Sequence, residues 1–365
     1  MKRILLVGEF SGLHKNLKEA LIKMGHEVYI VSAGDGVKGI ARDIDISVTG
    51  QTILEKVKSI RENKRVISEL KSFDVVQFIN PYIKPKTTLL SYNKLLKNNG
   101  KKFLLAAGDD VVFSEFIRNG GMEKYSPFDE ELANHLKLPY ENIMHRKVQN
   151  KIISKMDKII PNAFEYAEAY RKSKYKHKVA PTIPFPMNVD KIKFVEMEFS
   201  GKIVIYHASN RPLFKGSKYI TEALKIIGEK YPDEVEIINA EFLPLDEYLN
   251  VINRTHIVID QCKSYSYAMN ALYSLAKGKI VMSGSEEECI KELKLTSSPV
   301  INIIPNTLQI VEQIENLIKN RHYLAELSQS SRKFVEDHHH YMKVAELYLK
   351  EWFGTSDLVD KNETE

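Results

Sequence analysis

The stretch that decides the fold is Ile203–Gly216, which reads IVIYHASNRPLFKG and is followed by a helical pattern over residues 217–228. Its first residues are apolar and predict a strand, and its polar part carries Arg211 and Lys215. Apolar residues spaced three and four apart after Gly216 predict a helix with one buried face. The N-terminus of such a helix presents unpaired N–H groups and the positive end of the helix dipole, which together attract anions.

The side chains of this stretch suit a phosphate or pyrophosphate ligand. An arginine supplies a planar fork of donors, and a lysine supplies a compact charge. Gly216 would let the backbone approach such a ligand closely. A solvated basic loop has the same composition, so these residues alone leave both interpretations open.

Composition narrows the class of protein. The chain has 365 residues, a length that favours two domains, with 43% apolar and 28% charged residues as in ordinary globular proteins. A net charge of +5 is too small to indicate nucleic-acid binding. Two cysteines predict no disulfide framework, which favours the cytoplasm. No apolar run approaches the roughly 20 residues of a membrane span, so we expect a soluble protein, at most attached to one membrane face.

The N-terminal pattern is that of a doubly wound α/β domain. A strand over residues 4–7, the loop Gly8–His14, a helix and a strand over residues 28–31 form a βαβ unit. The glycines do not follow the G-x-G-x-x-G spacing, which argues against a nicotinamide or flavin enzyme, and we expect no cofactor.

Two further strands, over residues 74–80 and 102–107, continue this domain. The second ends at Gly108-Asp109-Asp110, and ligands of open α/β sheets collect at the carboxyl ends of strands. Asp109 is a candidate to orient or deprotonate a substrate hydroxyl, or a cap for the following segment, whereas Asp110 is predicted to be a cap. Periodicity is lost over residues 111–140, which we interpret as a substrate-facing excursion.

A proline-rich connector, VAPTIPFPMN over residues 179–188, predicts a domain boundary. The predicted organisation is a first domain over residues 1–185, a second over 186–331, a final helix over 332–353 and a polar tail over 354–365. In the second domain, strands are expected at residues 203–206, 235–238, 257–260, 280–282 and 300–304. The helices expected between and after them include residues 246–253, 269–277 and 307–319.

The second half resembles a known family. His207-Ala-Ser-Asn-Arg211 followed by Lys215-Gly216 resembles the arginine and lysine–glycine pair of the retaining glycosyltransferases of family 4. The stretch over residues 259–281 resembles their donor-binding strand, loop and helix, and Gly8–His14 is similar to their glycine loop. The resemblance implies the GT-B fold, in which two Rossmann-like doubly wound domains face each other across a cleft. It also implies that the final helix crosses back onto the first domain.

The resemblance further implies an enzyme that moves a sugar from a nucleotide-diphosphate donor to a glycan, lipid-linked or protein acceptor. It implies a retaining hexosyltransferase-like reaction without a metal ion, typical of bacterial polysaccharide biosynthesis. Arg211 and Lys215 would neutralise the leaving diphosphate, helped by backbone N–H groups of the Gly12 loop. The implied catalytic residues are Asp109, Arg211 and Lys215, and the donor-binding residues are Gly12, His14, Arg211, Lys215, Gly216, Ser266, Asn270 and Tyr273.

One departure from the family concerns two glutamates of the donor site. Counted back from Ala276-x-Gly278-Lys279, the corresponding positions are Tyr265 and Tyr273. Three alternatives follow: a changed donor contact, donor hydroxyls bound by Ser266, Asn270 or a tyrosine hydroxyl, or a protein that binds sugar nucleotides or glycans without catalysis. A GT-B epimerase is a further alternative.

Two other features have a structural and a functional interpretation. The basic segments over residues 145–158 and 172–178 are either solvated faces or contacts for anionic lipid headgroups. His338-His339-His340 is predicted to belong to the surface of the final helix rather than to a metal site, because adjacent helix positions do not face one another.

Overall fold

The computed structural model describes residues 1–36, 39–82, 89–127, 142–208, 211–240 and 245–354. The chain forms two compact units, and each is continuous in space but not in sequence. The first contains residues 1–119, 138–188 and 341–365, and the second contains residues 120–137 and 189–340. The prediction divided the chain once, after residue 185. In the structure, residues 120–137 from the first half of the chain also belong to the second unit.

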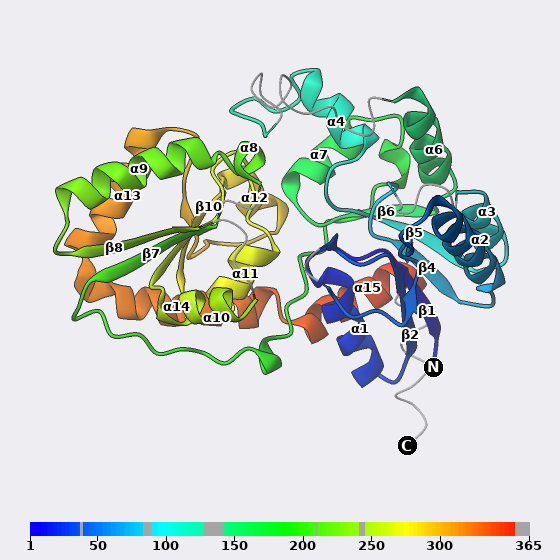
Figure 1. Cartoon of the computed structure of the whole chain (residues 1–365), viewed down its shortest axis with the longest axis horizontal. Coiled ribbons are helices and arrows are strands. Elements are labelled where there is room, and N and C mark those ends of the chain that lie inside the picture. The colour runs from blue at the N-terminus through cyan, green and yellow to red at the C-terminus, as the bar shows by residue number, and fades with distance from the viewer. Residues whose placement is uncertain (37–38, 83–88, 128–141, 209–210, 241–244, 355–365) are drawn as a thin grey trace. The chain divides into compact units, whose positions relative to one another are not determined.

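The first unit is built on a parallel sheet of six strands (Figure 1). The strands are β1 (Arg3–Val7), β2 (Glu27–Ser32), β3 (Ile44–Asp45), β4 (Val75–Phe78), β5 (Lys101–Ala106) and β6 (Lys158–Pro161). Their order across the sheet is β3-β2-β1-β4-β5-β6. The strands are nearly continuous apolar runs because helices cover both faces of the sheet.

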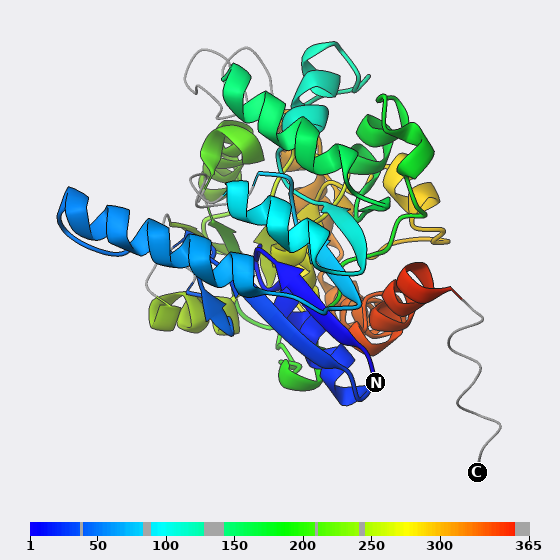
Figure 2. The ribbon, with the colours of Figure 1, turned by 90° about the vertical axis from the view of Figure 1, so that its right-hand side faces the viewer.

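Seven described helices belong to this unit: α1 (Leu13–Lys23), α2 (Ile53–Glu69), α3 (Leu89–Lys97), α4 (Val111–Arg118), α6 (Ile143–Ser154), α7 (Phe164–Arg171) and α15 (Tyr341–Phe353). Helix α1 packs against α15, and α2 packs against α3 on the other side of the sheet (Figures 1 and 2). The chain's last described helix therefore lies beside its first.

The second unit repeats this architecture with five parallel strands. They are β7 (Ile203–Ala208), β8 (Val235–Ala240), β9 (Ile257–Ile259), β10 (Ile280–Ser283) and β11 (Ile301–Asn302), in the order β11-β10-β9-β7-β8. Helices α9 (Ser217–Lys230) and α13 (Thr307–Lys319) cover one face. The other face is covered by α10 (Leu245–Arg254), α11 (Met269–Ala276) and α14 (Leu324–His338) (Figure 1). Two parallel-sheet units confirm the predicted α/β class.

Several elements differ from the prediction. Strand β3 and helix α3 were not predicted from the sequence, and the segment over residues 111–140 begins with a helix, α4, instead of a loop. Asp110 caps α4 by accepting a hydrogen bond from the N–H of Phe113, as predicted for Asp110. Helix α4 has only eight residues before Gly120, so too few turns are present for a periodic pattern to show.

The prediction of a single final helix is wrong. Two helices, α14 and α15, replace it, and they meet at His339 and His340. His339 is fully buried rather than on a helix surface, and its Nε2 lies 3.0 Å from the hydroxyl of Tyr267. The N–H of Tyr341 donates to the carbonyl of Met187 and so starts α15 in the first unit. Tertiary hydrogen bonds, not local propensity, set this break.

Among the described residues, no helix is long and apolar enough to cross a bilayer.

A buried lysine makes the stability of the second unit depend on pH. Lys279 has no exposed surface, and its Nζ lies 3.0 Å from the carbonyl of Asn253. Burial, with a smaller contribution from the charge of Lys277, lowers the pKa of Lys279 to about 8 from the ordinary value of 10.5. The unfolded chain therefore binds more protons between these two values, and stability rises with pH across that window.

We expect Lys279→Met to stabilise the protein at pH 7 by roughly 2 kcal/mol, the cost of a buried charge less that of one lost hydrogen bond. The gain should shrink as pH rises toward 10, where the wild-type lysine is neutral. Thermal melts of both proteins from pH 7 to pH 10 measure this difference. Lys225→Met, which alters an exposed lysine, serves as the control. A constant difference across the pH range would contradict the assignment.

Candidate functional site

The carboxyl ends of β7 and β9 form the switch point of the second sheet. Strand β7 has β8 on one side and β9 on the other, so the connections after β7 and after β8 leave the sheet in opposite directions. Ligands of open α/β sheets bind in the crevice that this reversal leaves. Arg211 and the one-turn helix α8 (Pro212–Lys215) follow β7, so the predicted cationic loop lies at the switch point.

Lys215 is held by a buried carboxylate in this crevice. Its Nζ lies 3.0 Å from Oδ1 of Asp260, directly after β9, and 3.2 Å from the carbonyl of Ala208. Asn270 donates to the same oxygen of Asp260 at 2.8 Å, and Asp260 is only 2% exposed. Asn270 was predicted to cap α11 or to bind donor hydroxyls. The cap position belongs to Ala268, and the Asn270 amide instead orients Asp260.

His207 fixes the start of α9 behind the lysine. Its Nδ1 donates to the carbonyl of Ile259 at 2.8 Å, which leaves Nε2 to accept from the hydroxyl of Ser217 at 2.9 Å. Burial lowers the pKa of His207 to about 4, so the ring is neutral at physiological pH. The histidine thus ties β7, β9 and the first residue of α9 together, and it adds no charge to the crevice.

Gly216 is required by packing inside the unit. Its φ of +75° favours glycine, and a Cβ atom there would lie 2.5 Å from Sγ of Cys262. Lys263 covers the same place, and its buried Nζ donates to the carbonyl of Leu213 at 3.1 Å. Close approach of a ligand, the predicted reason for Gly216, is therefore not needed to explain this glycine.

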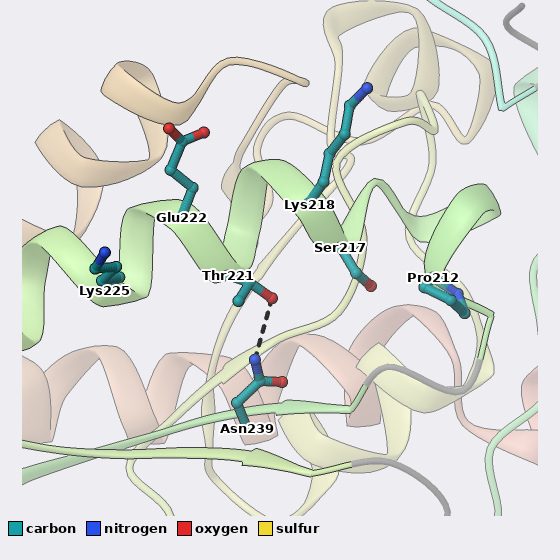
Figure 3. A pocket seen from close by; sticks show the side chains of 7 residues that line it. All are labelled: Pro212, Ser217, Lys218, Thr221, Glu222, Lys225 and Asn239. Carbon is teal, nitrogen blue, oxygen red and sulfur yellow. Dashed lines mark hydrogen bonds between the residues drawn. The ribbon is translucent and has the colours of Figure 1, made fainter. Parts of the chain in front are cut away.

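The other predicted cation, Arg211, is exposed, and its guanidinium lies 3.8 Å above the ring of Phe214. A pocket of about 560 Å³ lies next to it, along α9 and β8. Figure 3 shows its lining residues, with Asn239 donating to the hydroxyl of Thr221 at 3.0 Å. This pocket includes Pro212 but neither Lys215 nor Asp260, so it lies beside the switch point and does not coincide with it.

The tyrosine at position 265 has a structural partner. Its hydroxyl accepts a hydrogen bond of 2.7 Å from the N–H of Lys124, in the segment over residues 120–127 that belongs to the second unit. The ring of Tyr125 lies 5.1 Å from that of Tyr265. Tyr265 therefore anchors this segment, whereas Tyr273 is half-buried on α11 with Lys277 Nζ 5.8 Å from its ring centre.

A carboxylate does lie beside Tyr265, although no register shift of the sequence predicts it. The N–H of Glu286 donates to the carbonyl of Tyr265, and its side chain accepts from Lys124 at 2.6 Å, Tyr125 at 2.6 Å and Asn302 at 2.9 Å. Burial opposes ionisation of Glu286, but these hydrogen bonds outweigh it and lower its pKa. The pKa of Lys124 is raised, because hydrogen bonds to Glu286 and Glu288 outweigh its partial burial.

Removing the Tyr265 hydroxyl should loosen the segment over residues 120–127. In Tyr265→Phe the N–H of Lys124 loses its acceptor, which costs about 1 kcal/mol, or roughly fivefold in the opening equilibrium. Hydrogen–deuterium exchange of a peptide covering these residues measures the change. Tyr273→Phe removes a matched hydroxyl elsewhere and should leave the exchange unaltered. Equal exchange in wild type and Tyr265→Phe would show that the contact does not hold the segment.

In the first unit, two carboxylates accept hydrogen bonds from backbone N–H groups in or next to the loop Gly8–His14. Glu9 is 2% exposed and accepts from the N–H of Lys15 at 2.8 Å, and Asp35 accepts from the N–H of Ser11 at 2.8 Å. Burial raises the pKa of Glu9 to about 7. The N–H groups of Ser11 and Lys15 are thus engaged with carboxylates of the same unit, and the donor contact predicted for Gly12 stays a prediction.

His14 is a core residue of the first unit. The ring is fully buried, with Nδ1 2.7 Å from the carbonyl of Gly8 and Nε2 3.3 Å from the amide of Gln77. The indole N–H of Trp352 donates to the oxygen of the same amide at 3.2 Å. Burial lowers the pKa of His14 to about 4. Nδ1 thus contacts the loop of His14 itself, and Nε2 is linked through Gln77 to α15. The donor contact predicted for His14 stays a prediction.

The aspartates after β5 have different surroundings. Asp110 is buried and accepts from the hydroxyl of Tyr170 at 2.5 Å, and burial raises its pKa to about 6. Asp109 is half-buried, and its carbonyl accepts a long hydrogen bond of 3.3 Å from the amide of Asn80 at the end of β4. Asp109 thus lies at the carboxyl edge where it was predicted, and its catalytic role stays a prediction.

The structure therefore brings together Lys215 and Asn270 at Asp260, with Gly216 packed against Cys262 and with Arg211 at the start of α8. Ser266 is buried close by, and its carbonyl accepts from Gln261 at 3.1 Å. Sequence reasoning missed Asp260 and Glu286. The signal for Asp260 was present, because a carboxylate ends the predicted strand over residues 257–260.

No protein-family model and no curated protein matches this chain, but solved structures do. Sucrose-phosphate synthase from Thermosynechococcus elongatus matches with a TM-score of 0.66 at 13% identity, over 98% of this chain and 100% of that one. Anabaena HepE in complex with UDP and glucose matches with a TM-score of 0.61 at 9% identity, over 96% and 99%. UDP-GlcNAc 2-epimerase from Neisseria meningitidis, bound to UDP-GlcNAc, gives 0.53 at 13% identity, over 96% and 99%.

These likenesses establish the fold. The two parallel-sheet units are those of GT-B proteins, and the predicted GT-B fold is confirmed. Of these three neighbours, HepE was solved with UDP and glucose, and the epimerase was solved with UDP-GlcNAc.

Proposed function

We propose that this protein is a glycosyltransferase that takes a sugar from a nucleotide-diphosphate donor and transfers it to a glycan, lipid-linked or protein acceptor. One observation supports the proposal most strongly: Arg211 and Lys215, the latter positioned by Asp260, lie at the switch point of the second GT-B unit. A fold neighbour, HepE, was solved with UDP and glucose. The resemblance to family 4 adds retention of configuration and independence of metal ions to the proposal.

The proposed chemistry assigns a task to each cation. As the bond between the anomeric carbon and the diphosphate oxygen breaks, negative charge develops on the diphosphate. The acceptor oxygen becomes bonded to the anomeric carbon, and the proton of the acceptor hydroxyl passes to the departing diphosphate. Fixed cations stabilise that charge without reorganisation. Lys215 has three N–H donors; Asp260 and Ala208 engage two, which leaves the third to a phosphate oxygen. Arg211 supplies a bidentate fork. Asp109 remains the proposed acceptor-side carboxylate.

Two alternative functions have support. A fold neighbour is a sugar-nucleotide epimerase, which favours epimerisation as the second candidate. The second alternative is a protein that binds sugar nucleotides or glycans without catalysis. It is favoured by Tyr265, which stands at the position of a family glutamate and whose hydroxyl accepts a hydrogen bond from Lys124. Ser266, Asn270 and Tyr273 remain proposed donor contacts.

Incubation with a panel of nucleotide sugars separates these functions. We expect release of nucleoside diphosphate that rises when an acceptor is added, with a glycosylated product detected by mass spectrometry. Formation of an epimer without net release of diphosphate would indicate an epimerase. Tight binding with neither product would indicate a binding protein.

The proposal includes a cytoplasmic location with peripheral contact at an anionic membrane. Cys262 and Cys289 form no disulfide, which is typical of a reducing compartment. The basic helix α6 suits anionic headgroups.

A further inference from the structure

Two helices of the first unit begin with the same unusual arrangement of side chains. Helix α2 follows its N-cap Thr52 with Ile53 and Leu54, which are 81% and 82% exposed. Helix α6 follows its N-cap Asn142 with Ile143 and Met144, which are 68% and 66% exposed. The members of each pair occupy consecutive helix positions, about 100° apart, and both remain largely exposed.

The first half of α2 has no role in the core of its unit. Residues 51–58 are all exposed, and the buried side chains of α2, Asn63 and Ile67, lie in its second half. In Figure 2 the N-terminal half of α2 extends beyond the sheet at the left of the view. The N-terminal end of α6 lies on the same side of the first unit in that view. The N-terminal ends of the two helices, in which the apolar pairs lie, are thus on the same side of the unit in this view.

Basic side chains accompany both pairs. Helix α2 carries five of them after Leu54, namely Lys56, Lys58, Arg61, Lys64 and Arg65. The acidic residues of α2 are Glu55, in the capping box with Thr52, Glu62, and Glu69, which lies 3.9 Å from Arg65. Helix α6 carries Arg146, Lys147 and Lys151 and has no acidic residue, and Arg146 forms an ion pair with Glu115 of α4. The surface therefore combines exposed apolar tips with an excess of positive charge.

We propose that the N-terminal ends of α2 and α6 dock the first unit onto an anionic lipid bilayer. The four apolar side chains enter the boundary between headgroups and acyl chains, and the basic side chains contact the phosphates. A bilayer suits two separate apolar tips, since each inserts independently. A protein partner would instead require one contiguous patch of several hundred Å². This assignment rests on the proposed membrane contact and is independent of the transferase activity.

Flotation of the full-length chain with vesicles tests the surface. We expect binding to vesicles of phosphatidylcholine with 30% phosphatidylglycerol in about 0.1 M salt, and much weaker binding to phosphatidylcholine alone or in about 0.5 M salt. The variant with Ile53, Leu54, Ile143 and Met144 all replaced by serine should lose at least about tenfold in bound fraction. Leu308→Ser, which alters a 73% exposed leucine on α13 in the other unit, should bind like wild type.

A second variant reports insertion directly. The chain's single tryptophan, Trp352, is fully buried, so a new tryptophan at position 54 dominates any change in emission. The fluorescence emission of Leu54→Trp should shift to shorter wavelength on anionic vesicles, and that of Leu308→Trp should not. Absence of flotation with anionic vesicles, or wild-type flotation by the fourfold serine variant, would overturn the proposal. UDP binding measured on the same variants should stay unchanged, so a failed donor site and a failed lipid surface are distinguishable.

Discussion

Replacing both Arg211 and Lys215 by alanine is expected to weaken binding of UDP at least about hundredfold, equivalent to roughly 2.7 kcal/mol. It should also lower kcat/KM for sugar transfer by about 10³ or more, as removal of oxyanion-stabilising donors does in other enzymes. The reason is that these two side chains supply the cationic donors that follow β7 at the switch point. Isothermal titration with UDP and steady-state kinetics measure the two effects.

Two further variants make this prediction specific. Lys225→Ala removes an exposed lysine of α9 that lies farther along the helix, and it should leave both quantities unchanged. Asp260→Asn keeps the shape of the side chain that holds Lys215 but removes its charge. We expect Asp260→Asn to reduce kcat more than UDP affinity, because Lys215 keeps its charge and loses its fixed position. Undiminished UDP binding by the double variant would contradict the phosphate assignment.

A second large effect is expected at Gly284, where the loop after β10 packs against the loop after β9. A Cβ atom at Gly284 would lie 1.8 Å from the carbonyl oxygen of Ser264 and 3.2 Å from the carbonyl carbon of Tyr265. Both neighbours are backbone, so Gly284→Ala must push the two loops apart. We expect a loss of at least about 3 kcal/mol, and a fall in melting temperature of roughly 6 to 12 °C.

The matched control is Gly201→Ala in the same unit. A Cβ atom at Gly201 meets nothing within 4 Å, so this variant should melt within about 2 °C of wild type. Gly284→Ala should also disturb Tyr265 and Glu286, which are hydrogen-bonded to each other across the two loops. A Gly284→Ala protein as stable as Gly201→Ala would show that these loops do not pack as described.

The predicted fold depended on elements whose sequence pattern is local. Helix α13 begins and ends at Thr307 and Lys319 as predicted, because its apolar spacing and the Asn306 cap lie within the helix itself. Strand β7 was recognised from its apolar run before the polar loop. The division of the final helix into α14 and α15 depends on a hydrogen bond to Met187, over 150 residues earlier, which no local pattern reveals.

The part of the candidate site that was predicted also has a local sequence pattern. The cations Arg211 and Lys215 follow a strand and precede a helix, so their position was accessible from the sequence. The pairing of Lys215 with Asp260 joins residues 45 positions apart, and that of Lys124 with Glu286 joins residues 162 positions apart. The buried state of His14 depends on Gln77 and could not be read from its own loop.

The central claim is that a nucleotide diphosphate binds at the carboxyl ends of β7 and β9. A crystal structure of the protein soaked with UDP tests it most directly. We expect phosphate oxygens within about 3 Å of Lys215 Nζ and of the Arg211 guanidinium. Phosphates bound instead in the pocket along α9 and β8, or at the loop Gly8–His14, would contradict it.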